Sequence, residues 1–194
     1  MNTTLPKLAI IAAVLAFAPG CATNDPVTRT NAANASASQI SRDSREALAS
    51  LYSQNHSARA LGAKARAVLV FPSVTRAGFM VGGQAGNGAM LRRDGSVGGF
   101  YQTASASWGL QAGIQKFGYA LFLMDDAAVR NLNRSGGWEL GGSPSLVVVD
   151  RGMAGNLSTT TINSGTYAFF FDQRGLMAGL GLQGTKITRI NPGR

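Results

Sequence analysis

Apolar and polar residues alternate with a helical period over residues 38–64. The apolar positions recur at spacings of three, four and seven, which places them along one face of a helix. Ser38 or Ser41 is a candidate N-cap, and Gly62 is a candidate end of the helix. We therefore predict an N-terminal amphipathic helix whose apolar face packs on the domain core, with a membrane surface as the alternative. The apolar positions are Ile40, Ala47, Leu48, Leu51, Tyr52, Ala58 and Leu61.

After residue 66 the pattern changes to short apolar runs of strand length. Four such runs span residues 68–71, 119–124, 146–149 and 167–171, and each is bounded by Pro or Asp. They are rich in β-branched and aromatic residues, a composition typical of strands. This part of the chain therefore predicts a β-sheet.

A glycine-rich sequence, AGNG, lies between the apolar residues 77–84 and 89–92, and Asp94-Gly95 follows it. Both are turn signals, so we expect two successive hairpins. A phosphate-binding loop would need a helix directly after its glycines, and here a strand pattern follows without Gly-Lys-Ser/Thr. We therefore expect no nucleotide site. Glycine also recurs in the other apolar runs, where it permits bends and close backbone approach, and this predicts a strongly curved sheet.

A second short helix is predicted at residues 125–134, with Asp125 or Asp126 as its N-cap and the glycines that follow Arg134 as its end. Together these patterns indicate an α+β fold. It is expected to be mainly antiparallel and Gly-rich, with the amphipathic helix at its N-terminal end.

The first residues of the chain have the pattern of an export signal. Residues 8–18 are apolar, and Gly20-Cys21 follows at once. Residues 1–20 are therefore predicted to be a signal peptide, and the sequence before Cys21 resembles the lipobox of bacterial lipoproteins. Cys21 is the predicted lipidation site, and Ala22 after it favours an outer-membrane anchor. Residues 21–39, rich in Ala, Asn, Ser and Thr, are expected to form a flexible tether.

Charge narrows the class of partner. The chain has 18 Lys and Arg against 9 Asp and Glu, a net charge of +9. Basic proteins associate with phosphate-rich partners, but an exported protein seldom meets nucleic acid. Anionic membrane lipids are therefore the expected partners, and envelope proteins are a further possibility.

Catalytic and metal-binding chemistry has little support in the sequence. His56 is the only histidine, Cys21 is the only cysteine, and the carboxylates have no ligand spacing. No G-x-S-x-G motif is present. We expect no enzymatic activity, no cofactor and no metal.

Several stretches, among them ARAVLVFPSVTRAGFMVGGQAGNGAML and TYAFFFDQRGLMAGLGLQGTKI, resemble the SYLF family, or Ysc84-like lipid-binding domain, in its bacterial lipoprotein branch. The resemblance covers about residues 44–190, and we place the domain at residues 40–194. Eukaryotic members bind phosphoinositides through a basic N-terminal region, and some couple membranes to actin. The resemblance thus implies binding of an anionic phospholipid or a lipid A phosphate.

Basic residues cluster along the predicted helix and at one hairpin end. The hypothesis is an outer-membrane-anchored lipoprotein whose single domain binds anionic lipid without catalysis. The alternative is a structural or protein-interaction module with no lipid contact beyond its acyl anchor, in which the arginines only keep a Gly-rich sheet soluble. The candidate headgroup ligands are Arg42, Arg45, Arg59, Lys64, Arg66, Arg92 and Arg93.

Overall fold

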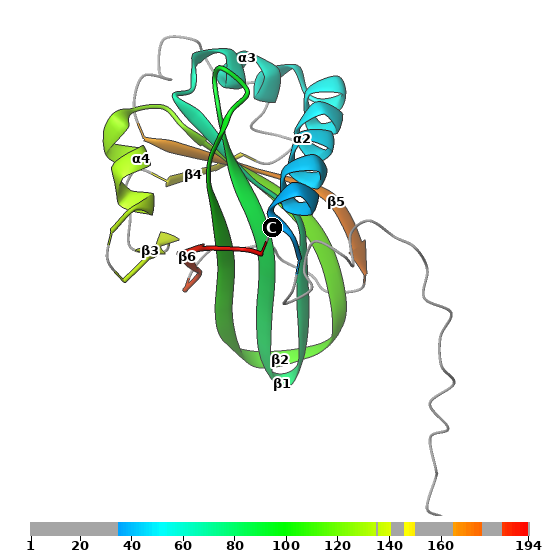
Figure 1. The fold of residues 1–194 in the computed structure, drawn as a ribbon. Helices are drawn as coiled ribbons and strands as arrows, with labels where there is room; N and C mark the ends of the chain where they lie inside the picture. Colours follow the sequence, from blue (N-terminus) through cyan, green and yellow to red (C-terminus); the bar gives the residue numbers. More distant parts are fainter. Residues whose placement is uncertain (1–34, 135, 141–145, 150–164, 176–183, 194) are drawn as a thin grey trace, which may run out of the picture.

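A computed structural model describes residues 35–134, 136–140, 146–149, 165–175 and 184–193. Within these ranges it is an α+β structure in which strands predominate, as predicted (Figure 1). The predicted signal peptide, Cys21 and most of the predicted tether lie outside the described residues. In chain order the elements are α2 (Ala37–Gln54), α3 (His56–Lys64), β1 (Ala67–Arg92), β2 (Val97–Leu123), α4 (Asp126–Leu132), β3 (Trp138–Glu139), β4 (Leu146–Val149), β5 (Thr166–Gly175) and β6 (Lys186–Ile190).

The predicted N-terminal helix is two helices, separated at Asn55. Helix α2 begins after Ser36, whose hydroxyl accepts a hydrogen bond from the Gln39 N–H at 3.2 Å, so neither predicted N-cap is used. Asn55 has an extended backbone and accepts from the Ala58 N–H at 2.9 Å, which makes it the N-cap of α3. Asn is one of the preferred N-cap residues, because its side chain accepts hydrogen bonds from the backbone N–H groups that follow it. This explains why the helix is interrupted at Asn55 although the apolar period continues.

The long strands β1 and β2 form one antiparallel hairpin, from the pair Ala67 and Leu123 to the pair Leu91 and Val97. The turn at Asp94-Gly95 is confirmed, but the predicted turn at AGNG is wrong. Residues 85–88 lie inside β1 and pair with residues 101–104 of β2.

The AGNG glycines serve close packing instead of a turn. A Cβ atom at Gly86 would lie 2.6 Å from the Ser73 carbonyl oxygen, and one at Gly88 would collide with the Val70 carbonyl oxygen. The second half of β1 therefore lies directly against its first half. Figure 1 shows the hairpin curling over at the end of the molecule away from the helices. This confirms the prediction that glycine permits close backbone approach in a strongly curved sheet.

The sheet has the order β3-β6-β2-β5-β4, with β1 paired to β2. Strand β2 is central because its first half pairs with β6 and its second half with β5, both antiparallel. Only the pairing of β4 with β5 is parallel among the described strands, so the sheet is mixed but mainly antiparallel.

Two apolar clusters fill the two faces of the curled sheet. On one face, α2 and α3 bury Ile40, Leu51, Ala58 and Leu61 against the sheet, so the prediction that the helical stripe packs on the core is confirmed. On the other face, α4 covers the cluster that contains Tyr119. Among the described helices, none is long and apolar enough to cross a membrane.

Candidate functional site

A groove of about 450 Å³ lies where α2, α3 and the β1–β2 turn meet. Four arginines line it: two come from the helices, one from the end of β1 and one from the turn that follows β1. Apolar side chains form the rest of its wall. The lining residues are Arg45, Leu48, Tyr52, Arg59, Gly62, Ala63, Ala65, Ala67, Val68, Leu91, Arg92, Arg93 and Gly95.

The β1–β2 turn brings Arg92 and Arg93 to the helices. Gly95 donates to the Arg92 carbonyl oxygen at 2.9 Å, and the Ser96 N–H donates to Asp94 Oδ1 at 2.9 Å. Gly95 has a φ of +79°, a conformation that glycine adopts without strain. The turn seen beside α3 in Figure 1 is thus fixed by the Asp-Gly sequence.

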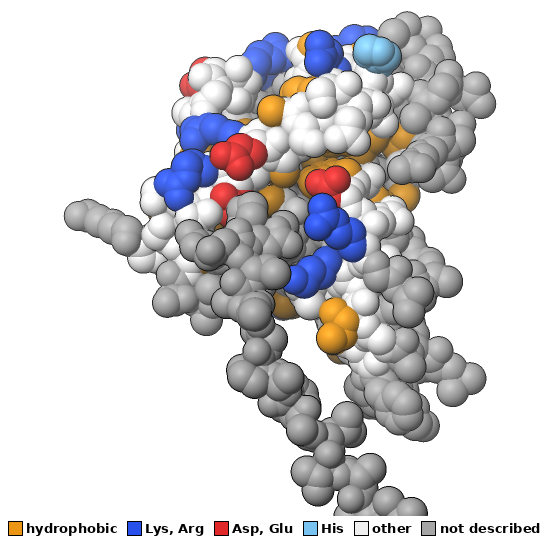
Figure 2. Space-filling view, turned by 90° about the vertical axis from the view of Figure 1, so that its right-hand side faces the viewer, with side chains coloured by type: hydrophobic (Ala, Val, Ile, Leu, Met, Phe, Trp, Pro, Cys, Tyr) orange, Lys and Arg blue, Asp and Glu red, His pale blue; other side chains and the backbone are white. Residues whose placement is uncertain are grey.

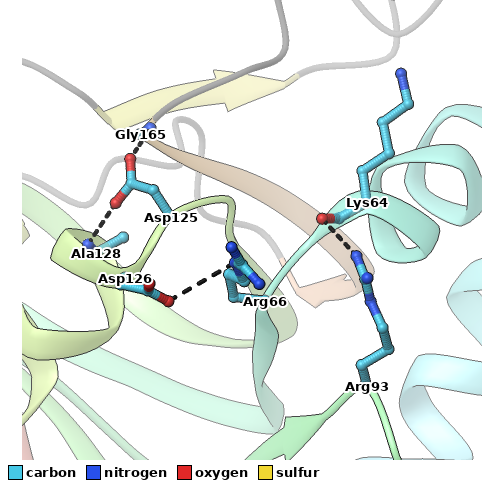
Figure 3. Close-up of polar contacts among 7 residues, drawn as sticks. All are labelled: Lys64, Arg66, Arg93, Asp125, Asp126, Ala128 and Gly165. Carbon is cyan, nitrogen blue, oxygen red and sulfur yellow. Dashed lines mark hydrogen bonds and ion pairs between the residues drawn. The ribbon is translucent and has the colours of Figure 1, made fainter.

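Backbone carbonyls hold three of the four arginines in place. Arg45 Nη2 donates to the Gly95 carbonyl at 3.0 Å, which ties α2 to the turn. Arg59 Nε donates to the Tyr52 carbonyl at 3.1 Å. Arg93 Nη2 donates to the Lys64 carbonyl at 2.8 Å, as Figure 3 shows. Because a carbonyl group carries no net charge, these bonds position the guanidinium groups without neutralising them.

The groove is correspondingly positive. In the part of the chain that the structure describes, none of its four arginines forms an ion pair with a carboxylate. Asp94 lies close by in the turn; hydrogen bonding from Ser96 lowers its pKa, with a smaller contribution from the charge of Arg92. On the side of the molecule drawn in Figure 2, Lys and Arg side chains are spread widely over the surface and hydrophobic side chains are exposed between them.

The apolar wall depends on a close contact between α2 and α3. Gly62 lies inside α3 and does not end it, so its predicted role as a helix end is wrong. A Cβ atom at Gly62 would collide with the Tyr52 hydroxyl oxygen, so only glycine leaves room for that ring. Burial raises the pKa of Tyr52, and its ring centroid lies 6.3 Å from that of Phe122 in the core.

Three of the seven predicted ligands lie outside the lining of the groove. Arg66 Nε is 3.7 Å from Asp126 Oδ1 (Figure 3). The two side chains are 60% and 69% exposed. Arg42 donates to Gln39 Oε1 on its own helix at 2.6 Å. Lys64 supplies its carbonyl oxygen to Arg93, and its ammonium group points away from that arginine (Figure 3).

The apolar half of the groove was missed by sequence reasoning. Leu48 and Tyr52 were recognised as members of the helical stripe, but Leu91 and Val68 come from a strand. No local pattern relates these positions, because they meet only after β1 packs under α2. Glycine in the middle of the helical pattern at Gly62 was the available signal of a close contact.

Other candidate chemistry is sparse in the described residues. His56 is exposed at the start of α3. No group of three or more His, Cys, Asp or Glu side chains within the described ranges could hold a metal ion.

Comparison with protein families gives one match. Residues 104–191 match the model of the Ysc84 family, described as "Las17-binding protein actin regulator". No curated protein matches the chain. The matched range takes in β2 from Ala104 onward and every element up to β6, whereas the arginines of the groove all precede it. The resemblance to the Ysc84 (SYLF) family is therefore confirmed over residues 104–191.

Proposed function

We propose that this chain is an outer-membrane-anchored lipoprotein whose single domain binds anionic lipid without catalysing a reaction. One observation carries the lipid-binding part. Four arginines line one groove, and three of them are positioned by neutral carbonyls instead of being neutralised by carboxylates. Each Lys or Arg near an anionic membrane contributes on the order of 1 kcal/mol, so four together provide useful affinity beside an acyl anchor.

The family match supports this proposal at a coarse level. The Ysc84 (SYLF) family is associated with lipid binding and with actin-related interaction. The signal peptide predicted at residues 1–20 favours lipid for this chain, because an exported protein does not meet the actin cytoskeleton. Ala22 after the lipidated cysteine is the reason for proposing the outer membrane.

The anchor and the groove are compatible in reach. Fifteen residues, 22–36, separate Cys21 from the start of α2 at Ala37. A chain of that length spans at most about 50 Å when fully extended. Acylation at Cys21 would thus keep the start of α2 within about 50 Å of the bilayer surface.

Vesicle sedimentation across a salt series tests the proposal. Residues 22–194 without an acyl chain should sediment with anionic vesicles and not with neutral ones, and binding should fall as salt rises. A variant with Arg45→Glu, Arg59→Glu and Arg93→Glu should lose this binding. Charge reversal at Arg130, Arg134 and Lys186, three exposed residues that do not line the groove, changes the net charge by the same amount and is the matched control.

Two results would refute lipid binding at the groove. One is the absence of binding to any vesicle, which would favour the alternative of a protein-interaction module in the cell envelope. The other is equal loss of binding in the groove variant and the control, which would show that net charge alone is responsible.

A further inference from the structure

The groove has two chemically different halves, and both bear on what it can hold. Four arginines approach it from α2, α3, the end of β1 and the β1–β2 turn: Arg45, Arg59, Arg92 and Arg93. Each guanidinium group has five N–H donors, and the carbonyl bonds described above use one donor on three of them. Donors therefore remain for an anion with several acceptor oxygens, and phosphate suits the planar fork of arginine.

The other half of the groove is mainly apolar, and the Tyr52 hydroxyl is the one polar side-chain group among the described lining residues apart from the arginines. Leu48 and Tyr52 are half-buried on α2, and Val68 and Leu91 are buried in β1 beneath them. A purely ionic ligand would leave this wall in contact with water. A ligand that carries an apolar chain next to its phosphate would cover both halves.

The size of the groove limits how much of such a ligand enters. Sites for small molecules occupy roughly 300–1,000 Å³, and this groove measures about 450 Å³. That is room for a phosphate with the first part of an apolar chain, but not for the whole of a two-chain lipid. The remainder of the chain would stay in the bilayer.

We infer that the groove binds one phosphate-bearing lipid molecule at a time, with its phosphate on the four arginines and its proximal hydrocarbon on the apolar wall. This rests on the proposed function and makes it more specific. The affinity of a surface that binds lipid only through diffuse charge would depend on the charge density of the membrane. The affinity of this groove depends on the structure of a single amphiphile.

Alkyl phosphates of increasing length distinguish the contribution of the arginines to binding from that of the apolar wall. The full chain, kept in a nonionic detergent, is titrated by calorimetry with methyl, butyl and hexyl phosphate below their micellar concentrations. The acyl anchor is present in every titration, so any effect it has on the measured affinity is the same for all three ligands. Each added methylene that reaches the wall should tighten binding by up to about fourfold, the equivalent of about 0.8 kcal/mol. The stoichiometry should be one alkyl phosphate per chain.

Variants of each half sharpen the test. Leu48→Gln keeps a good helix former at a half-buried position and should abolish the gain with chain length while leaving the affinity for methyl phosphate unchanged. Arg45→Gln should weaken all three ligands by a similar factor of about ten and preserve the gain per methylene. Arg42→Gln, one turn away on the same helix and outside the groove, is the matched control and should change neither.

The outcomes are distinct from those of the vesicle test. If anionic vesicles bind but affinity does not rise from methyl to hexyl phosphate, or rises equally in Leu48→Gln, the single-lipid site is refuted and charge-driven lipid binding stands. Binding of several alkyl phosphates per chain would refute it too. If neither vesicles nor alkyl phosphates bind, the proposed function itself fails.

Discussion

Substitution of Gly62 by alanine tests the contact that shapes the groove wall. In an ordinary helix interior this change stabilises a protein by about 0.5–1 kcal/mol, because glycine loses more backbone entropy on folding. Here the new Cβ atom would overlap the Tyr52 hydroxyl oxygen and lie 2.5 Å from Tyr52 Cζ. The ring must therefore move, and overpacking of this kind costs about 1–3 kcal/mol.

The net expectation is a loss of up to about 2.5 kcal/mol in the free energy of unfolding, or up to roughly 10 °C in Tm for a chain of this size. Urea denaturation followed by circular dichroism measures the change. The displaced ring should also disturb the wall beside Arg59, so alkyl phosphate binding should weaken in the same variant.

The same substitution in a Tyr52→Ala variant tests whether the Tyr52 ring causes the loss of stability. In a Tyr52→Ala protein the obstacle is gone, so Gly62→Ala should now be stabilising by about 0.5–1 kcal/mol. The sign of the effect thus depends on Tyr52. If Gly62→Ala stabilises the unaltered protein, or has the same effect in both backgrounds, the contact does not constrain the groove as described.

Three further predictions concern the scaffold. Gly88→Ala should destabilise by about 1–3 kcal/mol because its Cβ atom would meet the Val70 carbonyl, whereas Gly83→Ala, whose nearest atom would be at 3.5 Å, should have little effect; thermal denaturation compares the two. Arg66→Ala should cost at most about 1 kcal/mol in urea denaturation, since its ion pair with Asp126 is exposed. Hydrogen bonds from the backbone N–H groups of residues 165 and 128 lower the pKa of Asp125 in the folded protein. Its carboxylate therefore stabilises the fold fully above the pKa of the unfolded chain, about 3.9. This stabilisation is lost as the pH falls through the lower pKa of the folded protein. Unfolding of Asp125→Asn against the unaltered protein should therefore show a gap of under about 1 kcal/mol at neutral pH that closes in acid, and a gap that persists at low pH would contradict this.

The sequence predicts correctly the turn and the helix cap that depend only on neighbouring residues. The Asp94-Gly95 turn and the capping of α4 by Asp125 follow from residues within a few positions of each other, and both are confirmed. The break at Asn55 had a local signal too, an Asn able to cap a new helix, but the continuing apolar period outweighed it. The AGNG sequence was assigned to a turn because its Asn-Gly pair is a turn signal. In the structure it pairs with residues 101–104 of β2, and its glycines pack against the backbone of residues 70–73.

The groove depends on contacts that no sequence pattern encodes. The arginines stand out in the sequence as basic residues, but their convergence rests on bonds such as that from Arg45 to the Gly95 carbonyl, 50 positions away. The same limitation explains why Arg66 was grouped with Arg59. They are close in sequence, but Arg66 lies beyond the end of α3 and faces Asp126.

The match to the Ysc84 family and the groove occupy different parts of the chain, and the hairpin connects them. The matched range begins at Ala104, and its part of β2 pairs with the start of β1, so it fixes Val68 in place beneath the helices. The arginines come from residues 45–93, which precede the match. The matched part thus acts as a scaffold, and the preceding helices and turn determine which charges surround the groove. It follows that two proteins could share this sheet and differ in ligand, because replacing Arg45 or Arg93 changes the groove without altering a single strand pair. The function of this chain should therefore be sought in its N-terminal half, by variants that leave the matched range untouched.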